Sequence, residues 1–97
     1  MLIEAPYAKG DVISVRLSST EEIVGKLLEE TDKTIKLKQP LAALMSEKGV
    51  AMVPLMLTVN PESDLVINKN QIMIMAKTIK EVSDHYLQST TGITLGV

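Results

Sequence analysis

The chain has 97 residues, a formal net charge of −2 and no cysteine. Its length limits it to one domain, and the lack of cysteine excludes disulfides and thiolate zinc sites. Hydrophobic residues make up 45% of the sequence but aromatic residues only 2%, so the core must be built from aliphatic side chains and methionine. The slightly acidic balance is not that of a dedicated nucleic-acid binder, and any phosphate contact must come from a local cluster.

The first residues do not have the pattern of a signal peptide. Residues 1–6 lack the basic region and the long apolar core of a signal peptide. No apolar stretch has the length of a membrane span. We therefore expect a cytoplasmic protein that does not enter a membrane.

Alternating apolar residues predict three strands in the first part of the chain. They follow a short N-terminal arm, and their expected ranges are 12–17, 22–29 and about 34–40. Gly25 lies in the middle of the second strand, where a glycine indicates a bend, a bulge or a close backbone approach. A charged hairpin tip joins the second strand to the third.

Three further apolar runs follow, at residues 50–59, 65–67 and 72–75. The last two are predicted to form a tight antiparallel hairpin. Pro54 favours a sheet edge or a bulge, because it cannot donate a ladder hydrogen bond. Segment 46–64 is compatible with an extra hairpin arm or with an interface strand, and the sequence leaves both open.

A change of apolar period predicts a helix near the C-terminus. Thr78 and Glu81 have the spacing of a capping box, which begins a helix. Tyr86 lies on the apolar stripe and is expected to pack with its hydroxyl at the rim of the core. The predicted fold is thus mostly β, a small and strongly bent barrel with one short C-terminal helix. Its single domain divides into an arm at 1–10, a barrel at 11–76, a helix at 77–88 and a tail at 89–97.

The predicted run at 50–59 is apolar on both faces, and a strand of this kind needs cover on both sides. One short helix cannot supply that cover. We therefore expect identical subunits to bury the remaining edges and faces, so that the protein forms a homo-oligomer. The six methionines are expected as core filler, and a subunit interface is the alternative for Met52, Met56, Met73 and Met75.

Two stretches resemble the sequence motifs of Sm-like (Lsm or Hfq-like) proteins. In the first, a glycine in a bent second strand precedes an Asp-containing turn and an alternating third strand, as in residues 12–17, 24–27 and 32–37. The second motif is similar to residues 66–74. The resemblance implies a five-stranded bent barrel, ring formation through edge strands, and RNA binding at the pore of the ring. Small Sm-like proteins encoded by bacterial viruses are the most similar in overall pattern.

The chain departs from the family pattern at the expected nucleotide pocket. The family places Asn after an aromatic residue or His near the start of the third strand, and here Thr34 follows Lys33. The second motif usually contains Arg-Gly where this chain has Asn68 and Lys69. Stacking of a base on an aromatic side chain contributes roughly 1–3 kcal/mol elsewhere. The absence of such a residue therefore weighs against strong RNA affinity.

The candidate nucleic-acid site implied by this resemblance consists of two polar tips that would converge on the pore face. The residues are Lys33 and Thr34 on one tip, and Asn68, Lys69 and Asn70 on the other. In a ring these groups repeat, so that lysine would contact phosphate and asparagine would read base edges. The alternative explanation is that both tips are ordinary solvated turns, where Asn and Lys are common.

Nothing else in the sequence points to catalysis or to a metal. Glu29, Glu30 and Asp32 do not match the ligand spacing of a calcium loop. His85 belongs to no visible Ser-His-acid arrangement. We predict no enzyme, no cofactor and no metal site. The alternative to RNA binding is a protein-interaction or assembly component whose nucleotide pocket has been lost.

Overall fold

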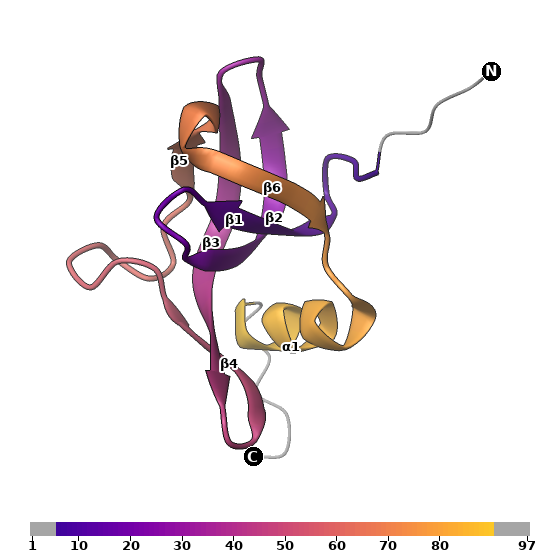
Figure 1. Cartoon of the computed structure of the whole chain (residues 1–97), viewed down its shortest axis with the longest axis vertical. Helices are drawn as coiled ribbons and strands as arrows, with labels where there is room; N and C mark the ends of the chain where they lie inside the picture. Colours follow the sequence, from indigo (N-terminus) through magenta and orange to yellow (C-terminus); the bar gives the residue numbers. More distant parts are fainter. Residues whose placement is uncertain (1–5, 91–97) are drawn as a thin grey trace.

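The computed structural model describes residues 6–90, and within them it contains six strands, one 3₁₀ turn and one α-helix. The elements are β1 (Val12–Leu17), β2 (Glu22–Glu30), β3 (Thr34–Ser46), β4 (Gly49–Pro54), β5 (Leu65–Asn68), η1 (Lys69–Gln71), β6 (Ile72–Lys77) and α1 (Lys80–Thr90). The strands form one antiparallel sheet in the order β4-β3-β2-β1-β6, and β5 pairs with β3 (Figure 1). The expected mostly β, bent sheet with one C-terminal helix is confirmed, and the predicted apolar run at 50–59 supplies β4.

The third strand continues well past its predicted end near Pro40. It bends at Gln39, which has a φ of 43°, and the register between β2 and β3 shifts at the same point. Beyond the bend, β3 and β4 form a hairpin arm, residues 41–54, that projects from the barrel (Figure 1). The run predicted as a strand to residue 59 ends as a strand at Pro54, and a loop follows over 55–64. Segment 46–64 thus begins as a hairpin arm.

Gly25 lies where β3 crosses close to β2. A Cβ atom at this position would be 3.1 Å from the Cβ of Leu37 and 3.4 Å from the Cα of Pro40. The 3.1 Å approach is tighter than an ordinary contact, so a methyl group would fit only if Leu37 moved by a few tenths of an ångström. The close approach that the sequence indicated at Gly25 is therefore present.

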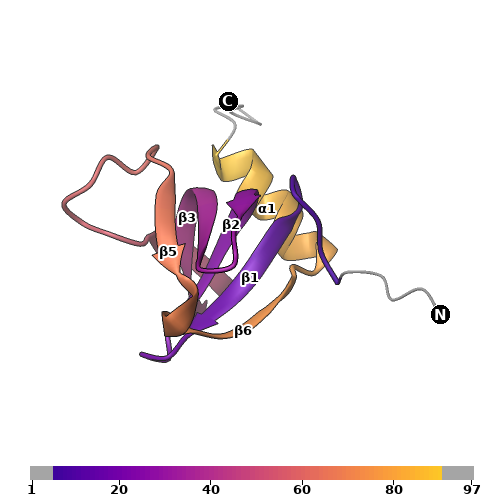
Figure 2. The same cartoon turned by 90° about the horizontal axis from the view of Figure 1, so that it is seen from above.

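The central strands β1 and β2 carry buried side chains on both faces of the sheet. The inner face of the bend holds a cluster of fully buried aliphatic side chains: Ile13, Val15, Ile23, Leu27, Ile35 and Leu37. On the outer face, Val12 and Val24 pack with Tyr86 of α1. Figure 2 shows α1 lying behind the strands of the barrel. The helix therefore covers one part of the outer face. Successive apolar residues of β1 and β2 point alternately into the inner cluster and into the cluster around Tyr86.

The helix begins later and ends later than the sequence predicted. Thr78 precedes it by two residues, and its hydroxyl lies 2.8 Å from the Oγ atom of Ser14 on β1. The carbonyl of Ile79 accepts the first helical hydrogen bond, from the amide of Ser83. The predicted capping-box start at Thr78 is thus wrong, because this hydroxyl ties the end of β6 to the sheet. Residues 89 and 90, assigned to the tail, belong to the helix, and 91–97 lie outside the described residues.

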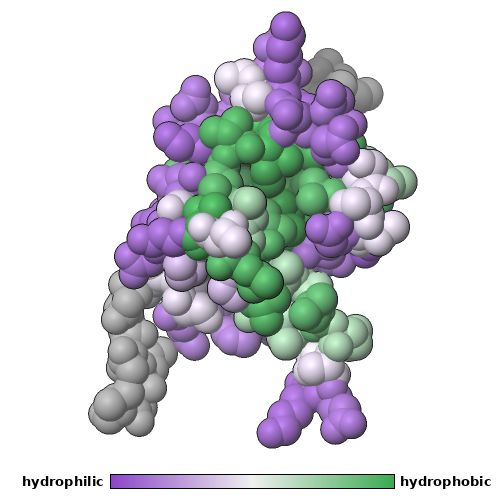
Figure 3. All heavy atoms as spheres, turned by 90° about the vertical axis from the view of Figure 1, so that its left-hand side faces the viewer, coloured by the Kyte–Doolittle hydropathy of each residue, from purple (hydrophilic) through white to green (hydrophobic). Residues whose placement is uncertain are grey.

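The predicted tight hairpin between β5 and β6 is wrong. β5 pairs with β3 and β6 with β1, and no backbone pairing joins β5 to β6 among residues 6–90. Instead, the turn η1 redirects the chain from one end of the curved sheet to the other. Val66 of β5 and Met73 and Ile74 of β6 have exposed side chains. Figure 3 shows the face that lies on the left in Figure 1. Hydrophobic side chains gather in the middle of this face and continue toward the hairpin arm.

Candidate nucleic-acid interface

The first polar tip is a turn organised by Thr31, between β2 and β3. The Oγ1 atom of Thr31 accepts hydrogen bonds from the amides of Lys33 (3.2 Å) and Thr34 (2.9 Å). The amide of Thr31 donates to the carbonyl of Thr34 at 2.8 Å. A side chain that bonds the backbone two and three residues further on fixes a tight turn. The turn leaves the side chains of Asp32 and Lys33 exposed.

The second polar tip follows β5 and is attached to the first. Thr34 and Asn68 are register partners across β3 and β5, and the amide of Lys69 donates to the carbonyl of Lys33 at 2.8 Å. The two tips enclose a shallow hollow of about 280 Å³, which we call the tip hollow. Its lining residues are Asp32, Lys33, Asn68, Lys69 and Asn70.

The ammonium group of Lys69 is already paired. Its Nζ lies 2.7 Å from Oε2 of Glu30, and the hydroxyl of Tyr7 donates to the same oxygen at 3.0 Å. The hydrogen bond from Lys69 holds the pKa of Glu30 below its ordinary value. Burial, and then the hydrogen bond to Glu30, raise the pKa of Tyr7. Lys69 is thus partly neutralised by a carboxylate that the N-terminal arm helps to position.

Lys33 is the freer cation of the tip hollow. Its side chain is exposed, and it takes part in none of the ion pairs formed within residues 6–90. Asn68 and Asn70 are also exposed and add amide groups that can both donate and accept hydrogen bonds. Lys33 and Asp32 both line the hollow, and Lys69 is paired with Glu30. The local charge is therefore close to zero when the nearest acidic residues are included.

The structure brings four of the five predicted site residues together around the tip hollow. Thr34 does not line it, because its hydroxyl lies 3.0 Å from Oγ1 of Thr31 inside the turn. Asp32 and Glu30 were not predicted for this site, although both belong to the acidic run that precedes the third strand. Tyr7 was missed as well, and no pattern in the sequence connects the N-terminal arm to the tips.

The remaining candidate residues do not gather into a second polar site. His85 is exposed on α1. Within residues 6–90 no three side chains of His, Asp or Glu are placed to hold a metal ion. No helix in the described part of the chain is long and apolar enough to cross a membrane. The absence of enzymatic activity and the cytoplasmic location stay predictions.

Comparison with solved structures decides the fold class. The chain is similar to the crystal structure of a heptameric archaeal Sm protein, discussed there in relation to the core of the eukaryotic snRNP. The two structures superpose with a TM-score of 0.50 at 14% sequence identity, over 72% of this chain and 88% of the archaeal one. The fold is Sm-like. No protein-family model matches the sequence, and no curated protein matches it either, so the Sm-like likeness is one of structure. The expected likeness to viral Sm-like proteins stays a prediction.

Proposed function

We propose that this Sm-like protein forms a ring of identical subunits and binds single-stranded RNA at the tip hollow of each subunit. The observation that carries the proposal is the hydrogen bond between the amide of Lys69 and the carbonyl of Lys33. It joins two tips that are far apart in the sequence into one polar surface. This hydrogen bond extends the pairing of β3 with β5, and it presents Lys33, Asn68 and Asn70 on one surface, as a binding site requires.

Ring formation is supported by two strand edges. β5 and β6 each have one edge without a strand partner among residues 6–90. Free edges of this kind pair readily with another chain. The exposed apolar side chains of Val66 and Ile74 would be buried by such pairing. The archaeal protein with the similar fold is heptameric, which favours a closed ring over an open chain of subunits.

The tip hollow offers chemistry suited to a single strand. Lys33 would contact a phosphate, and the amides of Asn68 and Asn70 would contact base edges or sugars. Repetition around a ring multiplies one weak contact into several, so that binding benefits from multivalency. The lining residues include no aromatic side chain. We therefore expect binding that depends strongly on salt and discriminates little between sequences.

Assembly with another protein, without RNA, is the second candidate function. Asp32 and Glu30 balance the charges of Lys33 and Lys69, and the whole chain has a net charge of −2. A surface of this kind concentrates little phosphate by long-range attraction. In this case the ring would form in the same way, and the tip hollow would be a solvated surface.

Titration of fluorescently labelled single-stranded RNA distinguishes the two candidates. We expect Lys33→Glu to weaken binding by more than about tenfold and to reduce its salt dependence, because a phosphate contact becomes a repulsion. Lys48→Glu at the tip of the hairpin arm is the control, since it changes the charge equally, far from the tip hollow in the sequence. No binding by the wild-type ring, or equal losses in both variants, would contradict the RNA-binding proposal.

A further inference from the structure

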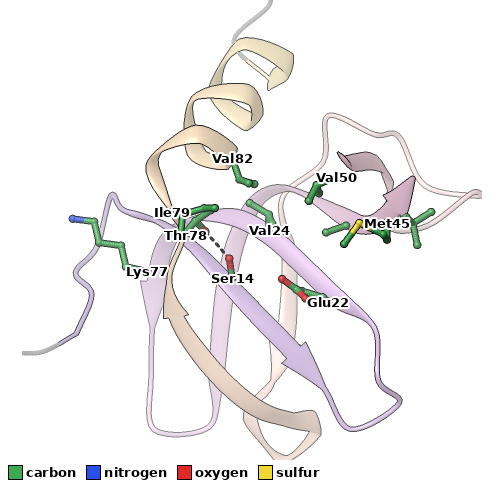
Figure 4. Close-up of a pocket in the computed structure, with 11 residues that line it drawn as sticks. Ser14, Glu22, Val24, Met45, Val50, Lys77, Thr78, Ile79 and Val82 are labelled. Atoms are coloured by element: carbon green, nitrogen blue, oxygen red, sulfur yellow. Dashed lines mark hydrogen bonds between the residues drawn. The ribbon is translucent and has the colours of Figure 1, made fainter. Parts of the chain in front are cut away.

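A second hollow lies between the beginning of α1 and the hairpin arm (Figure 4). Its volume is about 330 Å³, and we call it the helix groove. Its apolar lining comes from the sheet, the arm, the residue before α1 and the helix itself: Val24, Ala43, Leu44, Met45, Val50, Ile79 and Val82. The Sm-like barrel alone would not create this groove, because the arm and the C-terminal helix form its two walls.

The helix groove is apolar and only partly filled by its own chain. Met45 on the arm is 85% exposed and Ile79 at the start of α1 is 67% exposed. Val50, beside Met45, is exposed as well. Large aliphatic side chains facing each other across an open hollow indicate a surface that another group covers.

The loop between β4 and β5 carries side chains of the matching kind. Leu55 packs against the inner core and anchors the start of the loop. The next two residues turn outward, with Leu57 97% exposed and Met56 also exposed. A leucine with almost no contact in its own subunit is a candidate for burial in a neighbouring one.

Strand direction determines where this loop would lie in a ring. Every strand pair of the described sheet is antiparallel, and we expect a neighbour's β5 to pair with β6 in the same sense. The start of the neighbour's β5 then lies at the end of β6, next to Lys77. The loop residues that precede β5 therefore continue past Lys77 toward Thr78 and Ile79, which line the helix groove.

Charge complementarity points to the same arrangement. Lys77 lies at the rim of the groove with its ammonium group directed outward (Figure 4). Its side chain is mostly exposed, and the carboxylate that it pairs with inside residues 6–90, that of Asp11, is 4.0 Å away. The loop carries Glu62 and Asp64, both exposed. Antiparallel pairing brings Asp64 of one subunit to the level of Lys77 of the next.

We propose that the 55–64 loop of one subunit inserts Met56 and Leu57 into the helix groove of the adjacent subunit. The inference rests on the ring proposed above and adds a second contact to it, beside the pairing of β5 with β6. The apolar side chains would fill the groove, and Asp64 would pair with Lys77 at its rim. Each ring interface thereby includes the hairpin arm and α1 as well as the barrel edge.

Site-specific cross-linking tests this contact directly, because the chain has no cysteine of its own. Leu57→Cys and Ile79→Cys are made as separate variants, co-expressed, and treated with a short bis-maleimide. Only contact between subunits can then link the two positions. Val66→Cys co-expressed with Ile74→Cys reports pairing of β5 with β6, and light scattering records the mass of each sample before cross-linking.

We expect a covalent dimer of twice the 10.6 kDa chain mass from co-expressed Leu57→Cys and Ile79→Cys, and none from either variant alone. A ring that cross-links Val66→Cys to Ile74→Cys but not Leu57→Cys to Ile79→Cys would overturn the loop insertion and leave the ring intact. Monomers in every sample would overturn the ring, and the loop insertion with it.

Discussion

The hydroxyl group of Tyr86 donates a hydrogen bond to the backbone carbonyl of Lys38 and so attaches α1 to the bend of β3. The same hydroxyl accepts a hydrogen bond from the amide of Lys26 at 3.1 Å. Lys26 and Lys38 are register partners across β2 and β3, beside the shift at Gln39. Tyr86 thus occupies a place in the strand ladder, where it satisfies one donor and one acceptor of the backbone.

Replacement of Tyr86 by phenylalanine should destabilise the protein by about 1–3 kcal/mol, because a partly buried amide and a partly buried carbonyl lose their partner. The free energy of unfolding is measured by urea denaturation. Tyr7→Phe is the matched control, since it removes a hydroxyl that bonds an exposed carboxylate, and we expect it to cost less than about 1 kcal/mol. Equal effects of the two substitutions would contradict the role assigned to Tyr86.

The stability of the protein should fall as the pH rises above about 10. Burial raises the pKa of Tyr86 above its ordinary value of 10.0. The folded protein therefore retains the phenolic proton after the unfolded chain has lost it. This contribution to stability is complete below the unfolded pKa and is lost as the pH rises through the folded one. Urea denaturation between about pH 9 and pH 11 should show a steeper decline for the wild type than for Tyr86→Phe.

Substitution of Gly25 by alanine should destabilise the fold by about 1–3 kcal/mol, the usual effect of overpacking. The added methyl group would lie 3.1 Å from the Cβ of Leu37, so β2 and β3 would have to separate. Thermal unfolding followed by circular dichroism measures the change. An unchanged midpoint would show that the two strands have room to move apart.

The strands could be predicted from the sequence because each barrel strand carries its own period of two. Ile13 and Val15 on one strand and Ile35 and Leu37 on another are all fully buried, as their alternation indicated. The end of β3 could not be predicted in this way. Pro40 marks a bend there, and the strand continues because β4 pairs with its second half.

The pairing of β5 and the composition of the tip hollow depend on contacts between distant parts of the chain. A short polar connection between two apolar runs is typical of a hairpin. In the structure, however, β5 pairs with Thr34–Leu37 of β3 and not with β6. Lys33 and Lys69 were placed together by a family resemblance rather than by any local pattern. Glu30 pairs with Lys69. The sequence alone does not show which residue of the acidic run 29–32 would form this ion pair, because the choice depends on how the strands pair.

Removal of the Glu30 carboxylate should strengthen RNA binding. In Glu30→Gln the ammonium group of Lys69 loses its ion pair and becomes available to phosphate. We expect higher affinity, and a salt dependence steeper by about 0.7 for each additional phosphate that the protein neutralises. Asp84→Asn is the matched control, because it removes the carboxylate partner of Lys80 on α1 with the same change of charge. Equal increases in affinity in both variants would show that net charge, and not Lys69, governs binding.

Light scattering coupled to size exclusion, with absorbance at 260 and 280 nm, tests the ring most directly. We expect one wild-type species several times the 10.6 kDa chain mass, carrying excess absorbance at 260 nm if RNA co-purifies. We expect monomers from Ile74→Lys, at an exposed position on β6, because a charge would be buried at the subunit edge. A wild-type protein that elutes as a monomer would rule out the ring.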